Sequence, residues 1–392
     1  MSGIEPGDAV ALTAALVRVD SRNPSLVPDA PGERAAAVLL ADVLRAWGFR
    51  VELGDAAPGR PNVVARIGRA RPGAPTLMFN GHLDVVGVEG MVHAPFAAER
   101  RDGRLYGRGA TDMKGGVAAM CAAAWRAAGS GGGDALDGEV IVAAVADEEF
   151  ESLGTRALLA SGVRADAAVV TEPTRLAICP AHRGFAWVEV AVAGRAAHGS
   201  RYDLGVDAVR HAGLLLAELD RLDEEVLPRQ RTHPLLGRAS VHASTIAGGE
   251  GWSTYPGACV LRIERRTLPG ESSADAVREI EAACARVRAR RPTFDAAVTL
   301  AGGQGPSDVA QDAPIAVALA SALGARGEPV RFEGMSAWTD AALLNDAGIP
   351  AVCFGPGDIR LAHAAEEWVD VGEIERSVAV LEGMARGWCG KA

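Results

Sequence analysis

Histidines and acidic residues stand at the ends of the apolar runs of this chain. The stretch NGHLDVVG carries His82 and Asp84 two positions apart, directly after the apolar run TLMFNG. Further residues of the same kind follow other apolar runs or lie in GRGATDMKGG, namely Asp112, Glu148, Glu149, Glu172 and His363. Imidazole and carboxylate groups without thiolates are typical ligands of zinc and similar divalent ions in catalytic sites, where one position stays open for water. These residue types therefore favour a metal centre, provided that the fold brings them together.

The apolar runs alternate with amphipathic, alanine-rich segments, which is typical of strands connected by helices in a mostly parallel sheet. We therefore expect an α/β fold. The predicted buried strands are 62–68, 76–81, 139–146, 167–171 and 351–355. The predicted helices are 31–47, 112–128, 152–161 and 313–323. Because ligands bind outside the carboxyl ends of the strands in an open parallel sheet, the histidines and acids at those ends are expected to share one crevice.

Each of these positions also has a purely structural interpretation. A histidine and an aspartate at a strand end often form a satisfied polar pair, and Asp112 could be the N-cap of the helix that follows it. The adjacent Glu148 and Glu149 could form a solvated turn, and Glu172 or His363 alone would favour a structural role. These separate explanations leave the shared edge of the sheet unexplained, so a metal centre is the preferred interpretation.

Composition argues against several other classes of protein. The chain has 392 residues, 48% of them hydrophobic, which is enough for a large core and suggests two domains. Its net charge of -10 and its lack of a basic patch argue against nucleic acid or an anionic membrane as a partner. No apolar run approaches the roughly 20 residues of a membrane span, and no signal sequence is visible, so we expect a cytoplasmic protein. The six cysteines contain no CxxC pair, which argues against a disulfide framework and a thiolate zinc site.

The texture of the sequence changes near residue 183. The segments that follow alternate apolar and polar residues, as in a half-solvated antiparallel sheet, or have the periodicity of long amphipathic helices. The expected strands are 184–194, 240–249 and 258–268, and the expected helices are 206–222 and 273–290. We therefore expect a compact α+β domain at 184–297, inserted into a catalytic metal-binding domain formed by 1–183 and 298–392.

Several motifs together resemble those of the di-zinc aminoacylase and carboxypeptidase family. In chain order they are GHLDVV, GRGATDMKGG, DEE with TEP downstream, AAHGS, RRTLPGE, and GPG followed by AHAAEE. The likeness covers nearly the whole chain and is closest to the group of acetylornithine deacetylases and succinyl-diaminopimelate desuccinylases. It implies a zinc-binding domain interrupted by a smaller lid domain, which commonly forms a homodimer.

The resemblance implies a metal ligand at each of five positions. Asp112 would bridge two ions, with His82 and Glu172 completing the shell of one ion and Glu149 and His363 that of the other. The ions are expected to be zinc, and cobalt or manganese would suit the same ligands.

Two further residues are implied to support the chemistry. Asp84 would accept a hydrogen bond from the second ring nitrogen of His82 and thereby fix its tautomer. Glu148 would be the general base, because adjacent residues at a strand end point in different directions and Glu149 can bind metal while Glu148 faces the water.

Substrate contacts are implied at positions outside the metal shell. His198 in GRAAHGS resembles a family histidine that stabilises the oxyanion, often from the partner subunit. Arg266 in ERRTLPG resembles an arginine that binds a substrate carboxylate, whereas the adjacent Arg265 is expected to point the other way and to be solvated. Ser253 stands where the family often has an asparagine, and Gly355 is expected to let the backbone approach the substrate.

The expected activity is metal-dependent hydrolysis of the amide bond of an N-acyl amino acid, with acetylornithine-like substrates favoured. Within the resemblance, glutamate at position 172 favours acylases and carboxypeptidases over aminopeptidases. The nearest alternative is a carboxypeptidase or dipeptidase with the same site, which cleavage of a dipeptide with a free N-terminus would distinguish. The alternative of another class is a non-catalytic small-molecule binding protein. Such a protein would be expected to have lost ligands or the base, and all of them are present here.

Overall fold

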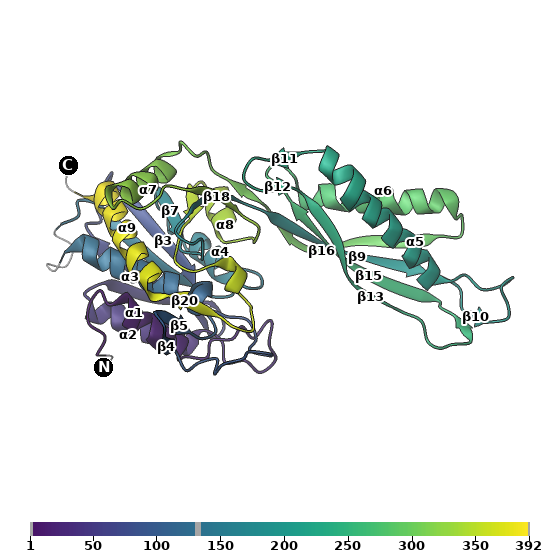
Figure 1. The fold of residues 1–392 in the computed structure, drawn as a ribbon, viewed down its shortest axis with the longest axis horizontal. Coiled ribbons are helices and arrows are strands. Elements are labelled where there is room, and N and C mark those ends of the chain that lie inside the picture. Colours follow the sequence, from purple (N-terminus) through teal and green to yellow (C-terminus); the bar gives the residue numbers. More distant parts are fainter. Residues whose placement is uncertain (1–2, 130–134, 391–392) are drawn as a thin grey trace. The chain divides into compact units, whose positions relative to one another are not determined.

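The structure, a computed structural model, describes residues 3–129 and 135–390 of the chain. The chain divides into two compact units, whose elements are labelled in Figure 1. Unit 1 comprises Met1–Pro180, Val309–Glu333 and Thr339–Ala392, and unit 2 comprises Ala181–Asp308 and Gly334–Trp338. Unit 1 is therefore assembled from segments that lie on both sides of unit 2 in the sequence.

The central strands of the unit 1 sheet are parallel. Their spatial order is β6 (Glu139–Val145), β3 (Thr76–His82), β7 (Ala167–Val170) and β19 (Ala351–Cys353). Antiparallel strands extend the sheet on both sides, with β2 (Arg60–Gly68) and β1 (Arg50–Ala57) beyond β6, and β8 (Ile178–His182) beyond β19. The expected α/β architecture with a mainly parallel central sheet is confirmed, although β2 runs antiparallel to its neighbour β6.

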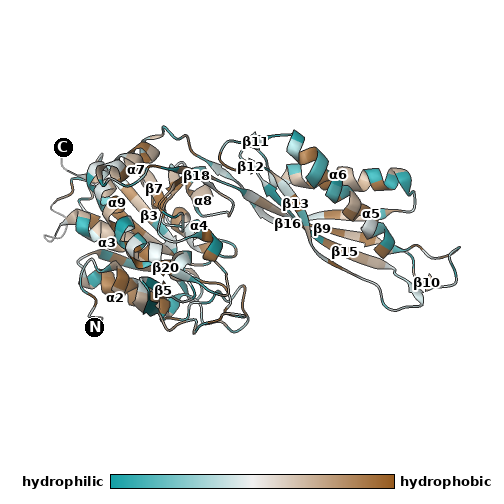
Figure 2. Cartoon of the chain, viewed as in Figure 1, coloured by the Kyte–Doolittle hydropathy of each residue, from teal (hydrophilic) through white to brown (hydrophobic). Residues whose placement is uncertain are grey.

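Helices cover both faces of this sheet because its central strands are apolar on both sides. Leu77 and Phe79 of β3 belong to a core that includes side chains from α1 (Ala9–Val17), α2 (Arg34–Ala46), α3 (Gly115–Ala128), α7 (Pro314–Ala325) and α9 (Val371–Cys389). Met78 is also buried but points to the opposite face, since successive strand residues alternate. There α4 (Leu153–Ala160) and α8 (Ala341–Asp346) pack against each other and against β6 and β7. Figure 2 shows the predominantly hydrophobic strands between these helices.

One predicted helix begins later than expected. The segment 112–128 was expected to be helical throughout, but α3 starts at Gly115. An irregular turn, η1 (Ala110–Lys114), precedes it, and Asp112 and Met113 have non-helical backbone angles there. The delay takes Asp112 out of the helix and leaves its side chain free to face the sheet edge.

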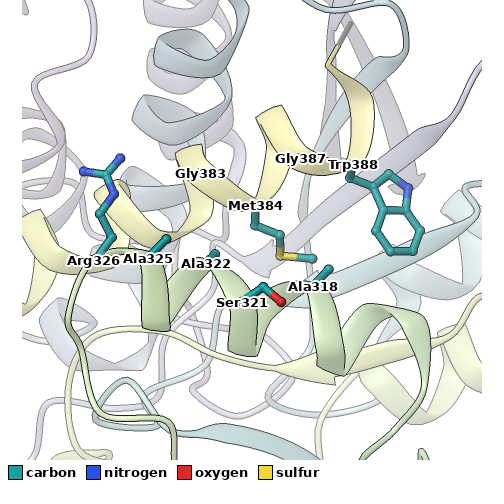
Figure 3. A pocket seen from close by; sticks show the side chains of 9 residues that line it. All are labelled: Ala318, Ser321, Ala322, Ala325, Arg326, Gly383, Met384, Gly387 and Trp388. Atoms are coloured by element: carbon teal, nitrogen blue, oxygen red, sulfur yellow. The ribbon is translucent and has the colours of Figure 1, made fainter. Parts of the chain in front are cut away.

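A groove of about 350 Å³ lies between α7 and α9 on unit 1. Small side chains and glycines make most of its walls, with Met384 and Trp388 as the large apolar residues and Arg326 at one end (Figure 3). None of the site residues predicted from the sequence lines this groove.

Unit 2 contains a four-stranded antiparallel sheet in the order β13 (Ser240–Gly248), β15 (Ala258–Thr267), β9 (Gly184–Ala193) and β16 (Asp295–Gln304). Two helices, α5 (Ala208–Arg221) and α6 (Ser273–Arg290), pack on one face and share an apolar core with it. The predicted domain boundary at 297 falls inside β16. Because β16 stays paired with β9 as far as Gln304, the second boundary lies after Asp308.

Short elements complete both units. In unit 1, β20 (Trp368–Asp370), β5 (Arg104–Tyr106) and β4 (Glu99–Arg101) form a small sheet. In unit 2, β10 (Ala197–His198) pairs with β14 (Thr254–Tyr255), and β11 (Thr232–His233) pairs with β12 (Gly237–Arg238). All six cysteines are buried and free. Among the described helices, none combines the length and the apolarity required to cross a bilayer.

Candidate metal centre

The carboxyl ends of the central strands bring the predicted metal-binding residues together. His82 is the last residue of β3, Glu148 and Glu149 follow β6 closely, and Glu172 follows β7. Two groups of possible ligands result: His82 with Asp112 and Glu149, and His82 with Glu148 and Glu172. Within each group the ligand atoms lie within 4.8 Å of one another. The crevice expected at the sheet edge therefore gathers a compact set of imidazole and carboxylate groups.

Two glycines let the segments that carry these residues approach each other. A Cβ atom on Gly116 would lie 1.9 Å from the carbonyl oxygen of Thr171, and one on Gly355 would lie 2.5 Å from the same oxygen. A side chain at either position would therefore push apart the segments that hold Asp112 and Glu172. The glycine at 355 was expected to make room for a substrate, and the structure shows that it makes room for the end of β7.

Asp112 stands between two histidines. Its Oδ1 atom lies 3.1 Å from Nε2 of His82, and its Oδ2 atom lies 3.4 Å from Nε2 of His363. The N-cap interpretation of Asp112 is wrong, because α3 begins at Gly115 and Lys114 occupies its N-cap position. One carboxylate thus presents a different oxygen to each imidazole.

Glu367 holds the backbone of Asp112 and was missed in the sequence. One of its carboxylate oxygens accepts the N–H groups of Thr111 and Asp112 at 3.1 and 3.2 Å. The other accepts a hydrogen bond from Nη1 of Arg108 at 2.6 Å, and both Glu367 and Arg108 are buried. The sequence signal for this role was its place in AHAAEE, shortly after His363.

The adjacent glutamates face different partners. Oε2 of Glu149 lies 3.0 Å from Nε2 of His363, whereas Oε2 of Glu148 lies 4.0 Å from Nε2 of His82. Their side chains are only 7% and 10% exposed, respectively. The interpretation of this pair as a solvated turn is therefore wrong, and Glu148 groups instead with His82 and Glu172.

Asp84 contacts His82 through its backbone. The carbonyl oxygen of Asp84 lies 2.9 Å from Nδ1 of His82, whereas the carboxylate oxygen Oδ1 is 3.7 Å away. Since a carbonyl oxygen only accepts hydrogen bonds, Nδ1 carries a proton, and in the neutral ring Nε2 presents its lone pair. The expected acceptor residue is correct but the expected atom is wrong. The carboxylate instead accepts the backbone N–H groups of Glu148 and Glu149, each at 3.1 Å.

Burial and like charge raise the pKa values of the clustered acids. Burial raises the pKa of Glu172 well above its usual range, and the charge of Asp112 adds to the effect. Burial also raises the pKa of Glu148 well above its usual range, with His82 opposing and the charges of Glu172 and Asp340 adding. A divalent cation between these groups would relieve the repulsion that produces such shifts.

The histidines respond in the opposite direction. Burial lowers the pKa of His82, but the hydrogen bond with Asp112 and the charges of nearby acids raise it well above its usual value. Hydrogen bonds with Asp112 and Glu149 raise the pKa of His363 to about 10. Protons therefore occupy the positions where a metal ion would supply positive charge, and the donor set fits a divalent metal.

Three predicted residues belong to unit 2. His198 in β10 pairs with Thr254 in β14, and Ser253 directly precedes that strand, so the structure brings His198 and Ser253 together. Arg266 lies in the larger sheet, on β15, where its Nε donates a hydrogen bond to Glu264 at 2.7 Å.

Arg265 is not solvated as expected. Its side chain is 1% exposed, and its guanidinium donates to Glu279 at 2.8 Å and to Glu271 at 3.1 Å. Strand alternation places Arg265 on the face of the sheet that α6 covers, and acids from α6 and the segment before it provide its partners.

Buried histidines and carboxylates at the carboxyl edge of a parallel sheet define a metal-dependent hydrolase. Residues 78–387 match Peptidase family M20/M25/M40, and the chain belongs to this family. It is a metal-dependent amidohydrolase.

Relatives of known name agree with this class. The chain is 33% identical to an acetylornithine deacetylase of Myxococcus xanthus over 353 residues, covering 88% of this chain and 90% of the relative. It is 32% identical to an N-acetyl-L-citrulline deacetylase of Xanthomonas campestris pv. campestris over 379 residues, covering 95% and 96%. A Bacillus subtilis protein described as a dinuclear metal binding peptidase from family M20 has the same fold, with a TM-score of 0.71, 17% identity and 96% of each chain covered.

Proposed function

We propose that the metal centre binds two divalent ions bridged by Asp112, with His82 and Glu172 on one ion and Glu149 and His363 on the other. The observation that carries this proposal is the position of Asp112, whose two oxygens each face a different histidine at 3.1 and 3.4 Å. A bridging carboxylate requires such an arrangement. Imidazole and carboxylate ligands suit zinc best, with cobalt and manganese as possible substitutes.

Glu148 is the proposed general base. When bound, such a pair of ions supplies an acidified water molecule and an electrophile for the substrate carbonyl oxygen. Glu148 takes the proton of the attacking water and delivers it to the departing amine nitrogen. Its place beside His82 and Glu172, with its backbone held by Asp84, supports this role.

The proposed substrate is an N-acyl amino acid with a short acyl group. Two relatives with names refer to deacetylation of an amino acid, acetylornithine in one and N-acetyl-L-citrulline in the other. Arg266 would bind the substrate carboxylate, while His198 would stabilise the oxyanion, with Ser253 beside it and Gly355 near the substrate. The partial exposure of Arg266 and the exposure of His198 support these assignments, since a substrate can reach both side chains.

Unit 2 is the proposed site of homodimerisation. Strand β13 lies at the edge of its sheet, and most of its residues are exposed, including Ile246 at 49%. An exposed edge strand with an apolar side chain is a template for pairing with another chain. The proposed location is the cytoplasm, which the six free cysteines support.

The function is tested by incubating zinc-loaded protein with N-acetyl, N-succinyl and longer N-acyl amino acids and with dipeptides, and by measuring amine release by mass spectrometry. We expect chelator-sensitive release from one acyl class. Glu148→Gln should lower kcat about 10²–10⁴-fold with the metal content unchanged. Glu151→Gln, at an exposed position in the same turn, is the matched control and should keep full activity.

Other outcomes would contradict the proposal. Release only from dipeptides with a free N-terminus would identify a peptidase with the same site. Silence across the panel with metal bound would rule out hydrolysis of N-acyl amino acids.

A further inference from the structure

The turn that carries Glu148 and Glu149 is held by two buried carboxylates. The carboxylate of Asp84 accepts the N–H groups of Glu148 and Glu149, each at 3.1 Å. The carboxylate of Asp147 accepts the N–H group of Glu151 at 3.2 Å. The backbone of both glutamates therefore depends on where Asp84 and Asp147 place their oxygens.

Asn23 joins these two carboxylates. Its Nδ2 group donates to Oδ2 of Asp84 at 2.8 Å and to Oδ1 of Asp147 at 3.0 Å. Its Oδ1 accepts the backbone N–H of Ser25 at 2.8 Å and a hydrogen bond from Nη2 of Arg60 at 3.0 Å. The side chain is fully buried, and its two N–H bonds and its oxygen are all engaged. Only this orientation of the amide works, since the reverse would set its oxygen against two carboxylates.

Arg60 supplies positive charge to the same cluster. Its Nη1 donates to Oδ1 of Asp147 at 2.6 Å, and its Nε donates to Oε2 of Glu33 at 3.0 Å. Arg60, Glu33 and Asp147 are all buried. The planar fork of a guanidinium can meet both acids and the oxygen of Asn23 at once, which an ammonium group cannot do in the same geometry.

We propose that Asn23, oriented by Arg60, is a positioning residue that sets the backbone of Glu148 and Glu149 for metal binding and proton transfer. This inference rests on the proposed function of those glutamates. A cluster that only tied the segment after α1 to β2 and β6 could have ended on any backbone groups. The cluster ends instead on the N–H groups of the proposed base and of a proposed ligand.

Asn23→Asp is the sharpest variant, because it keeps the shape of the side chain and replaces the amide donor by a third acidic oxygen facing Asp84 and Asp147. Residues that orient metal ligands typically change metal affinity or activity about 10–100-fold when they are substituted. We expect a loss of that size in Co²⁺ affinity and in kcat for Asn23→Asp. KM should remain close to that of the unmodified protein, because the substrate contacts are untouched.

The matched control is Asn345→Asp. The amide of Asn345 donates to the backbone oxygens of Ala341 and Ala351 at 2.8 and 3.0 Å, so the same substitution there also removes internal hydrogen bonds. Each full-length protein is stripped of metal and titrated with Co²⁺ against a chelator. Its visible absorption spectrum and its unfolding in urea are recorded. The spectrum reports the ligand geometry without requiring any substrate.

The inference is supported if Asn23→Asp loses Co²⁺ affinity and changes the Co²⁺ spectrum while Asn345→Asp, even if less stable, changes neither. It is overturned if Asn23→Asp lowers only the stability. Should Asn23→Asp fail to fold, Arg60→Lys is measured in the same way, and an unchanged Co²⁺ affinity and spectrum would overturn the inference. An unmodified protein that binds no Co²⁺ would overturn the proposed metal centre itself, so the two failures are distinguishable.

Discussion

The backbone carbonyl oxygen of Asp84 lies 2.9 Å from Nδ1 of His82, so the main chain rather than the side chain orients the imidazole. This leaves the carboxylate of Asp84 available for the N–H groups of Glu148 and Glu149. One residue thereby links the orientation of a histidine on β3 to the position of the glutamates after β6. The aspartate in the HLD sequence serves two neighbouring strands.

Asp84→Asn should separate these two tasks. The asparagine keeps the main-chain contact to His82, but its NH₂ group faces one of the two backbone N–H donors and leaves that donor without an acceptor. We expect kcat to fall about 10–100-fold. The tautomer of His82, followed by long-range ¹H–¹⁵N NMR, should be unchanged. A change of tautomer in this variant would show that the carboxylate orients the ring after all.

Metal affinity should increase with pH. Hydrogen bonds with Asp112 and Glu149 raise the pKa of His363 from 6.5 to about 10 in the metal-free protein, so the ring is protonated at neutral pH. A metal ion must displace that proton, and the cost of doing so falls as the pH rises towards the raised pKa. Between about pH 6 and pH 9 the Kd should fall about tenfold per pH unit for each proton released. Chelator competition across this range measures the slope, and a flat profile would exclude His363 as a ligand.

Removing Arg265 should destabilise unit 2 strongly. Breaking a buried ion pair by deleting one partner typically costs about 3–5 kcal/mol, because the remaining charges stay buried without compensation. Arg265→Met would leave Glu271 and Glu279 in that state. Arg262→Met is the control, since Arg262 is 70% exposed where it pairs with Glu189 and should contribute at most about 1 kcal/mol. Urea unfolding of both variants provides the comparison, and equal losses would refute the assigned role of Arg265.

The edge strand β13 provides a test of the proposed dimer. Ile246→Lys places a charge on this exposed edge, which should prevent pairing with a second chain. Leu300→Lys is the matched control, because Leu300 is 46% exposed on β16 at the opposite edge of the same sheet. Molecular mass by light scattering should show a monomer for Ile246→Lys and a dimer for Leu300→Lys. A monomeric unmodified protein would exclude the proposed assembly.

The strand pattern predicted the site because the ligands follow it. His82, Glu149 and Glu172 stand directly after apolar runs, and the edge of a parallel sheet gathers whatever follows its strands. His363 and Asp112 needed the family motifs as well, because a loop or a turn separates each of them from the nearest strand or helix.

Residues whose roles depend on distant partners could not be predicted in this way. Asn23, Arg60 and Glu33 meet only in the folded chain, and no periodic pattern marks them. The alternation rule correctly separated the directions of Arg265 and Arg266. It could not show that α6 brings Glu279 to Arg265, and the expectation of a solvated side chain was therefore wrong. The domain boundary at 297 failed for a related reason, since the pairing of β16 with β9 is a long-range contact.

The insertion of unit 2 sets an order of events during synthesis of the chain. Strand β19 fits between β7 and β8, which are made before most of unit 2, whereas β19 is made after it. The facing edges of β7 and β8 must therefore wait on the ribosome without their partner, while the strands of unit 2 have theirs much sooner. His363 emerges later still. The four other proposed ligands are translated early but have no complete partner set until the final segment has joined the sheet, so a chain that terminates prematurely would carry an acidic pocket unable to hold its ions properly.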